Sequence, residues 1–191
     1  YQVDTSWIQI VYRASTDLWW KKQGIIPAIN IGISVSRVGS KAQLPAYKAV
    51  AGDMKISYSQ FEELEAFSKF GTQLDEATQK TLARGERIRE TLKQSQYKPL
   101  KASEQIVVIY ATNIGVFDDV PLNNVHKLQD ELVKQANVSL KHILDEIDNG
   151  AKLNEKFKEE IAKLAKEQNL TKVALDVDAE DQTLIKLYKK F

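Results

Sequence analysis

Apolar residues recur at helical spacing between residues 74 and 164 of this 191-residue chain. They form three stripes, whose members are Leu74, Leu82, Gly85, Ile88 and Leu92; then Leu128, Leu132, Ala136, Leu140, Leu144 and Ile147; then Leu153, Phe157, Ile161 and Leu164. Side chains that recur every three to four residues share one face of a helix, and that face is buried against other helices. The sequence therefore predicts a mainly α-helical fold with a bundle over residues 40–168.

Local signals predict where some of these helices begin and end. A short helix is expected over residues 104–111, with an interruption near 113–115. Pro121 is expected to open one long helix, which Asn149 and Gly150 end. Gly85 lies on the apolar face of the first stripe, where a glycine costs about 1 kcal/mol relative to alanine. Its place there predicts a close approach by another helix.

Charged residues are expected to lie mostly on solvated helix faces. This holds for the acidic cluster Glu62, Glu63 and Glu65, and for the Lys/Glu alternation over 152–166, which places opposite charges four residues apart. The two histidines, His126 and His142, lie sixteen residues apart, and we expect no metal site at either.

The segment before the bundle is typical of strands. Ile29, Ile31, Ile33 and Val35 alternate at period two, and residues 7–12 form another apolar run of strand length. Both runs are nearly continuous in apolar character, as is usual for strands that are covered on both faces.

Arg37 follows the second strand, between Ser36 and a Val-Gly step. Ser40 is a good N-cap residue, so we expect a helix to begin at Lys41. An arginine on a strand-to-helix turn is held on a stiff scaffold, and its guanidinium then suits a phosphate on a neighbouring molecule. The alternative is a surface arginine in a local ion pair.

Composition excludes several classes of protein. The net charge of +1 provides no basic field for binding nucleic acid, and the lack of cysteine excludes disulfides and thiolate metal sites. No apolar run approaches the roughly 20 residues that a membrane-spanning helix needs. The sequence also contains no phosphate-binding loop of the GxxxxGK[ST] type.

Residues 27–43 read Pro-Ala-Ile-Asn-Ile-Gly-Ile-Ser-Val-Ser-Arg-Val-Gly-Ser-Lys-Ala-Gln. This stretch resembles the alpha subunit of the rotary (F-type) ATP synthase, whose family reads Pro-Ala-Ile-Asn-Val-Gly-(Leu/Ile)-Ser-Val-Ser-Arg-Val-Gly-Ser-x-Ala-Gln. Similar blocks follow in the family's order at 48–52, 67–75, 84–87 and 92–99. The resemblance is strong over residues 24–120 and continues in pattern to about 168. The catalytic beta subunit has a different signature around its arginine, which favours alpha.

The resemblance implies that Arg37 is an arginine finger, which reaches the nucleotide held by the neighbouring beta subunit. An arginine supplied in trans is worth about 10³–10⁵ in the rate of phosphoryl transfer. Ser36 would help to position the turn, and it is a weaker candidate.

The resemblance also implies a second, non-catalytic nucleotide site. Gln94 and Gln96 would lie over the adenine of ATP or ADP bound with Mg, and Pro27 would lie beneath it. A side-chain amide suits this role because it offers a donor and an acceptor to a base edge. The family has an arginine where this protein has Ile26, and no metal ligand is expected within the 191 residues themselves.

The family carries its phosphate loop upstream of the arginine block, so this chain is expected to be a carboxyl-terminal piece of an alpha subunit. Residues 1–39 would be the last strands of an α/β nucleotide-binding domain, 40–168 the helical bundle, and 169–191 an extension with strand-like alternation at 173–178.

The resemblance implies a place in a proton-translocating complex, and the chain alone would not be catalytic. The implied partners are the beta subunit, a companion chain with the phosphate loop, the central-stalk subunit gamma and the peripheral stalk. The expected location is the matrix side of the mitochondrial inner membrane, or else the cytoplasmic side of a bacterial plasma membrane. A degenerate or split alpha-like structural subunit without nucleotide function is the alternative, motivated by Ile26 and the altered segment 4–10.

Overall fold

The computed structural model describes residues 37–68, 74–93 and 99–177, and the elements in these ranges are all helices. They are α3 (Arg37–Ala42), α4 (Pro45–Ser68), α5 (Glu76–Thr91), α6 (Ala102–Asn113), α7 (Leu122–Ser139), α8 (Lys141–Asp148) and α9 (Glu155–Val177). The mainly helical fold is therefore confirmed for this part of the protein. The strands predicted at 7–12 and 29–35 lie outside the described residues.

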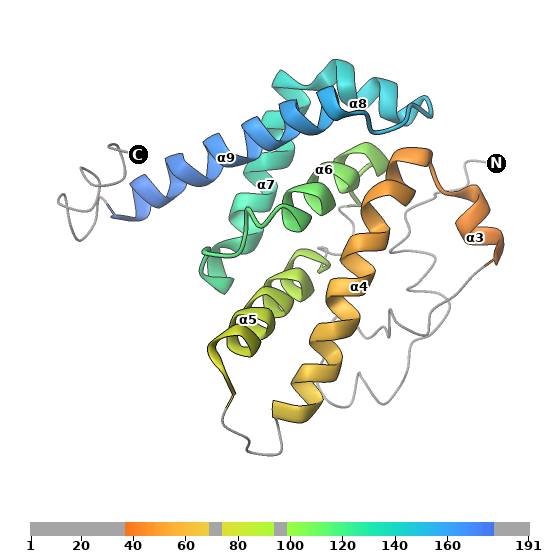
Figure 1. Ribbon diagram of the computed structural model, residues 1–191. Helices are drawn as coiled ribbons and strands as arrows, with labels where there is room; N and C mark the ends of the chain where they lie inside the picture. Colours follow the sequence, from red (N-terminus) through yellow and green to blue (C-terminus); the bar gives the residue numbers. More distant parts are fainter. Residues whose placement is uncertain (1–36, 69–73, 94–98, 178–191) are drawn as a thin grey trace.

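Helix α6 runs through the middle of the bundle (Figure 1). It contacts α4, α5, α7, α8 and α9, and its apolar character extends around the whole helix rather than along one stripe. Its buried residues are Ser103, Gln105, Ile106, Val107, Val108, Ile109, Ala111 and Thr112. A helix that is hydrophobic on all sides is one that other helices surround. The prediction of a helix here is confirmed, and Gly115 follows it with a positive φ of 82°.

Helices α4 and α5 lie side by side in opposite directions (Figure 1). They approach each other closely at Gly85, where an added β-carbon would lie only 2.0 Å from Cγ of Phe61. The close approach that the sequence predicted at this glycine is confirmed.

The backbone around Ser40 differs from the prediction. A short helix, α3, already begins at Arg37, and α4 begins separately at Pro45, so Ser40 lies within α3 instead of capping a helix from Lys41. Pro45 accounts for the separate start of α4, because proline is favoured at the first position of a helix and disfavours helical backbone in the residue before it. The two helices are therefore divided at Leu44, whose side chain packs against the core.

The single long helix predicted after Pro121 is also wrong, because it is divided into α7 and α8 at Leu140. Residues four apart drift by about 40° at each step around a straight helix, so a stripe with this spacing would turn away from the core. The break at Leu140, with φ −116° and ψ 23°, restores the buried face. Leu140, Ile143 and Ile147 are all buried as a result.

Helix α9 continues to Val177, so the strand-like alternation noted at 173–178 does not form a strand within the described residues. The alternation is only three apolar residues long, whereas the preceding residues propagate a helix at little cost per added residue.

Candidate functional site

The residues singled out from the sequence lie at the limits of the described structure. Arg37 is the first residue of α3, but only its backbone is described. Pro27, Ser36, Gln94 and Gln96 lie outside the described residues. What the structure does describe is how the helices next to Arg37 and Gln94 are held in place.

Helix α3 lies at the outer end of α4 (Figure 1). The backbone N–H of Gln43 donates to the Gly39 carbonyl at 3.1 Å, and the N–H of Lys48 donates to the Leu44 carbonyl at 3.1 Å. Val38, directly after Arg37, is 80% exposed. Arg37 therefore begins a short helix at the surface of the bundle, joined to the core through Leu44.

Helix α5 leads directly to Gln94 and Gln96. It ends at Thr91, whose hydroxyl donates to the Ile88 carbonyl at 2.9 Å. Near this end, the Glu90 carboxylate contacts Lys93 Nζ at 2.5 Å and His126 Nε2 of α7 at 2.9 Å. The residues just before Gln94 are thus tied both to their own helix and to α7.

The antiparallel register brings this end of α5 toward the half of α4 that carries α3. Gly85 lies against Phe61, and Arg89, one turn further along α5, contacts Tyr58, nearly one turn earlier in α4. The end of α5 at Thr91 and the start of α4 therefore lie on the same side of the Phe61–Gly85 contact.

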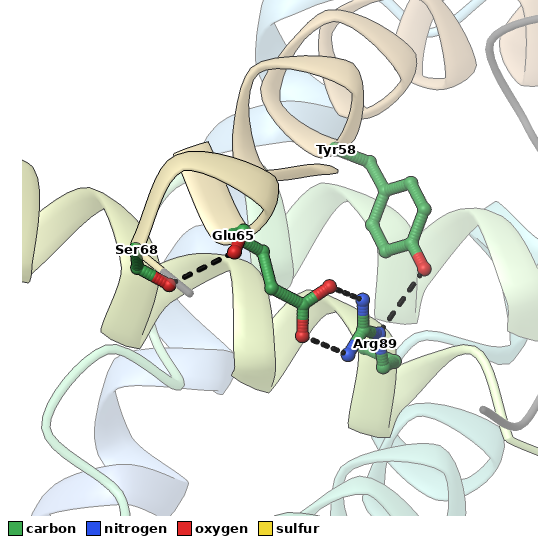
Figure 2. A network of polar contacts seen from close by, with 4 residues as sticks. All are labelled: Tyr58, Glu65, Ser68 and Arg89. Atoms are coloured by element: carbon green, nitrogen blue, oxygen red, sulfur yellow. Dashed lines mark hydrogen bonds and ion pairs between the residues drawn. The ribbon is translucent and has the colours of Figure 1, made fainter. Parts of the chain in front are cut away.

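Arg89 is the central polar residue of the α4–α5 contact (Figure 2). Its Nη1 and Nη2 donate to the two carboxylate oxygens of Glu65 at 2.8 and 2.6 Å, and its Nε donates to the Tyr58 hydroxyl at 3.2 Å. The guanidinium also lies 4.5 Å from the centre of the Phe61 ring. Two parallel bonds to one carboxylate give this pair a fixed geometry.

The electrostatics of this contact follow from burial and pairing. Burial lowers the pKa of Arg89, but its hydrogen bonds to Glu65 and Tyr58 outweigh burial, and the net shift is upward. Burial raises the pKa of the Tyr58 hydroxyl, and the nearby Arg89 offsets part of that rise. Arg89 therefore remains a cation at neutral pH.

The prediction that the acidic cluster is a solvated face is wrong for two of its three members. Glu65 pairs with Arg89 and is only 25% exposed. Glu62 is half-buried, and burial raises the pKa of its carboxyl to about 7, with Arg89 lowering it and Glu65 raising it. Only Glu63 is exposed as expected.

Two further arginines of α5 hold the turn between α6 and α7. Arg84 donates to the Asn113 carbonyl at 2.6 Å and to Asp118 Oδ2 at 3.1 Å. Arg87 Nε donates to the Val120 carbonyl at 2.9 Å. Arg84 and Arg87 thus fasten α5 to the α6–α7 turn, and Arg89 fastens it to α4.

Sequence reasoning did not single out these contacts, because the partners are distant in sequence. Arg89 and Glu65 are 24 residues apart, and Arg84 and Asp118 are 34 apart. The one available signal was that the arginines fall beside the buried stripe that includes Gly85 and Ile88, where a long side chain must reach a partner at the edge of the core.

The two histidines form interhelical pairs. His126 contacts Glu90, and His142 Nε2 of α8 lies 3.5 Å from Glu160 of α9. Within the described residues, no three His, Cys, Asp or Glu side chains are grouped so that they could hold a metal ion. Among the described helices, none is both long enough and apolar enough to cross a membrane.

Comparison with known proteins places this sequence in a family. Residues 43–168 match the family described as ATP synthase alpha/beta chain, C terminal domain. The protein is 49% identical over 132 residues to ATP synthase subunit alpha 2 of Syntrophus aciditrophicus. The matched stretch covers 69% of this chain and 25% of that relative.

Two further relatives agree. Identity is 46% over 148 residues with ATP synthase subunit alpha 1 of Rhodopirellula baltica (75% of this chain, 29% of the relative). It is 47% over 127 residues with ATP synthase subunit alpha of Ehrlichia canis (66% and 25%). The match spans only 25–29% of the length of these relatives. This protein therefore belongs to the ATP synthase alpha/beta family through its carboxyl-terminal domain, and it corresponds to the carboxyl-terminal part of an F-type alpha subunit.

Proposed function

We propose that this chain supports ATP synthesis and hydrolysis as the carboxyl-terminal part of an alpha subunit in a proton-translocating F-type ATP synthase. The observation that carries the proposal is the family match over residues 43–168, immediately after the Ser-Val-Ser-Arg-Val-Gly sequence that contains Arg37.

Arg37 is proposed to act in trans on the nucleotide of the neighbouring beta subunit, with Ser36 positioning the turn. The surface position of α3 supports this role, because a finger residue must project beyond its own subunit. Its guanidinium would neutralise charge that builds on the transferred phosphoryl group, which is where a fixed cation lowers the barrier most.

Gln94, Gln96 and Pro27 are proposed to contact the adenine of a non-catalytic ATP or ADP. The firm attachment of α5 supports this role, since a base is recognised by amides that are held in place before it arrives. The phosphates and Mg would be bound by a phosphate loop outside this sequence, and the chain alone would hydrolyse nothing.

The proposed assembly follows from these roles. The beta subunit is the direct partner of Arg37, and a companion segment or chain supplies the phosphate loop. The bundle would lie beside the central-stalk subunit gamma, with the peripheral stalk also in the complex. The complex would be associated with the mitochondrial inner membrane on its matrix side, or with a bacterial plasma membrane on its cytoplasmic side.

A second candidate function is that of an alpha-like structural subunit without a nucleotide role. Ile26 favours it, because the family has an arginine at this position next to the adenine-contacting proline. The altered segment at 4–10 favours it as well.

Purification of the native complex through a tag on this protein separates the two functions. The proposal predicts that the beta subunit co-purifies in fixed stoichiometry, together with a GxxxxGK[ST] sequence. Intact-mass measurement then shows whether that sequence lies on a companion chain or upstream on the same polypeptide. A complex that contains the beta subunit but no GxxxxGK[ST] sequence of the alpha type would favour the structural alternative. A complex without the beta subunit would contradict both functions.

A further inference from the structure

A buried polar pair links the first turn of α4 to the residues that lead into α6. The Tyr47 hydroxyl donates to Gln105 Oε1 at 3.0 Å, and Gln105 Nε2 donates to the Leu100 carbonyl at 2.8 Å. Tyr47 and Gln105 are each only 2% exposed. Two side chains that are 58 residues apart in the sequence thus hold one backbone carbonyl from inside the core.

The chemistry of the three groups fixes the direction of both hydrogen bonds. A backbone carbonyl can only accept, so the Gln105 amide presents its NH₂ group to Leu100 and its oxygen to Tyr47. Burial raises the pKa of the Tyr47 hydroxyl above its ordinary value, so this group keeps its proton at neutral pH and can donate. A flipped amide would set two oxygens against each other at Leu100, and the link therefore has a single arrangement.

Stability alone does not account for a polar pair at this position. Most of the other buried residues of α4 and α6 are apolar. Replacing two buried hydrogen-bonding partners by apolar groups of the same shape is nearly neutral for stability. What the Tyr47–Gln105 pair adds to the core is a fixed position for the Leu100 carbonyl.

Leu100 closely follows the proposed adenine-contacting segment. Gln96 is four residues before it, so their α-carbons can be no more than about 14 Å apart. Pro99 stands between them, and its ring fixes one of the few backbone dihedrals that separate them. Before the segment, Lys93 is bound to Glu90 at the end of α5. Described residues thus anchor the chain on both sides of the segment.

We propose that Tyr47, acting through Gln105, is a positioning residue for the segment that contains Gln94 and Gln96. This inference rests on the proposed nucleotide role of that segment. By holding the Leu100 carbonyl, the pair places the two amides before the base arrives, which lowers the cost of ordering them on binding. The amides then favour adenine over guanine, because the two bases present donors and acceptors in different patterns.

Retention of ATP and of GTP by the assembled enzyme carrying Tyr47→Phe tests this role, because the change removes only the hydroxyl. The wild type should retain ATP in preference to GTP at the non-catalytic site. In Tyr47→Phe, the buried Gln105 oxygen loses its donor, and ATP retention should fall roughly tenfold while GTP retention changes little. The preference for ATP is then lost.

Tyr110→Phe is the matched control. Tyr110 lies on the same helix as Gln105, but the charges that act on its hydroxyl come from Lys158, Glu155 and Glu159 of α9. This variant should keep the wild-type preference for ATP. An equal loss of ATP and GTP in Tyr47→Phe would indicate a general weakening of the bundle and would overturn the positioning role.

Failure of the adenine pocket has a different signature. If the double variant Gln94→Ala with Gln96→Ala keeps the preference for ATP, the pocket itself is excluded, and the inference fails with it. If that double variant loses the preference but Tyr47→Phe keeps it, the pocket stands and only the role of Tyr47 is overturned.

Amide hydrogen exchange of the wild-type complex gives an answer even if Tyr47→Phe does not assemble. In the first turn of α6, the Gln105 backbone N–H donates to the Lys101 carbonyl at 3.0 Å. Its protection should rise severalfold when ATP replaces GTP at the non-catalytic site. The Lys158 N–H, which donates to the Asn154 carbonyl at 3.1 Å in the first turn of α9, should keep its protection. No change at Gln105, or the same change at both amides, would overturn the proposal.

Discussion

The ring of Phe61 lies directly against the backbone of Gly85, so that helices α4 and α5 approach each other where residue 85 has no side chain. An added β-carbon there would lie 2.0 Å from Phe61 Cγ and 2.1 Å from Cδ2, far inside van der Waals contact. This contact fixes the distance between α4, which follows Arg37 in the sequence, and α5, which precedes Gln94.

Gly85→Ala should therefore lower the free energy of unfolding by about 1–3 kcal/mol, because the helices must separate, even though alanine is the better helix former. Urea denaturation of the two proteins measures the change. Gly52→Ala is the matched control: Gly52 lies in α4 with no atom within 4 Å of an added β-carbon. That variant should be slightly more stable than the wild type. Equal effects at both glycines would show that packing at Gly85 is not tight.

The Glu65–Arg89 pair should contribute measurably to stability, unlike the exposed pairs of this protein. A double-mutant cycle with Glu65→Gln and Arg89→Gln is expected to give a coupling of about 1–2 kcal/mol, because the pair is bidentate and partly buried. The exposed pair Glu76–Lys80, with side chains 82% and 76% exposed, should give about 0.5 kcal/mol or less. A coupling for Glu65–Arg89 no larger than that of the exposed pair would contradict the structure.

Asp148 of α8 should stabilise the start of α6. Its Oδ1 accepts from the Ser103 backbone N–H at 3.2 Å and its Oδ2 from the Ser103 hydroxyl at 2.9 Å, which satisfies a free N–H of the first turn. Asp148→Ala is expected to cost about 1–2 kcal/mol in thermal or chemical unfolding. The exposed Asp145→Ala, on the same helix, should cost well under half of that, and a larger loss at Asp145 would refute the capping role.

Replacing Gln94 and Gln96 by alanine should weaken retention of nucleotide at the non-catalytic site of the assembled enzyme without abolishing turnover. Each change removes a polar partner of a buried base edge, a loss of about 1–3 kcal/mol. The measurement is tightly bound nucleotide per purified complex, and Gln60→Ala, an exposed glutamine of α4, is the control. Unchanged nucleotide content in the double variant would exclude the adenine-contacting role.

The sequence predicted the helical class, the close approach at Gly85 and a short helix over residues 104–111, because each depends on residues near one another in the sequence. The predicted helix start at Lys41 and the undivided helix after Pro121 were wrong, although nearby residues indicated both breaks. Pro45 divides α3 from α4, and the four-residue spacing of the stripe through Leu140 requires a break between α7 and α8.

The polar contacts were not predictable in the same way. Whether Glu65 lies in solvent or binds Arg89 depends on the rotation of α4 relative to α5, which the contact between Phe61 and Gly85 helps to determine. A charged residue in an acidic cluster is usually solvated. Only the packed structure shows that this cluster is divided between the surface and the helix contact.

The proposed role of Arg37 is tested most directly by ATP turnover of the assembled enzyme carrying Arg37→Lys. Lysine keeps the positive charge but loses the planar fork that binds phosphate oxygens in pairs. The account predicts a loss in turnover of about 10³-fold with assembly intact, while Lys41→Ala, at an exposed position of the same short helix, leaves turnover nearly unchanged. Near-normal turnover of an assembled Arg37→Lys enzyme would contradict the account and remove Arg37 from catalysis.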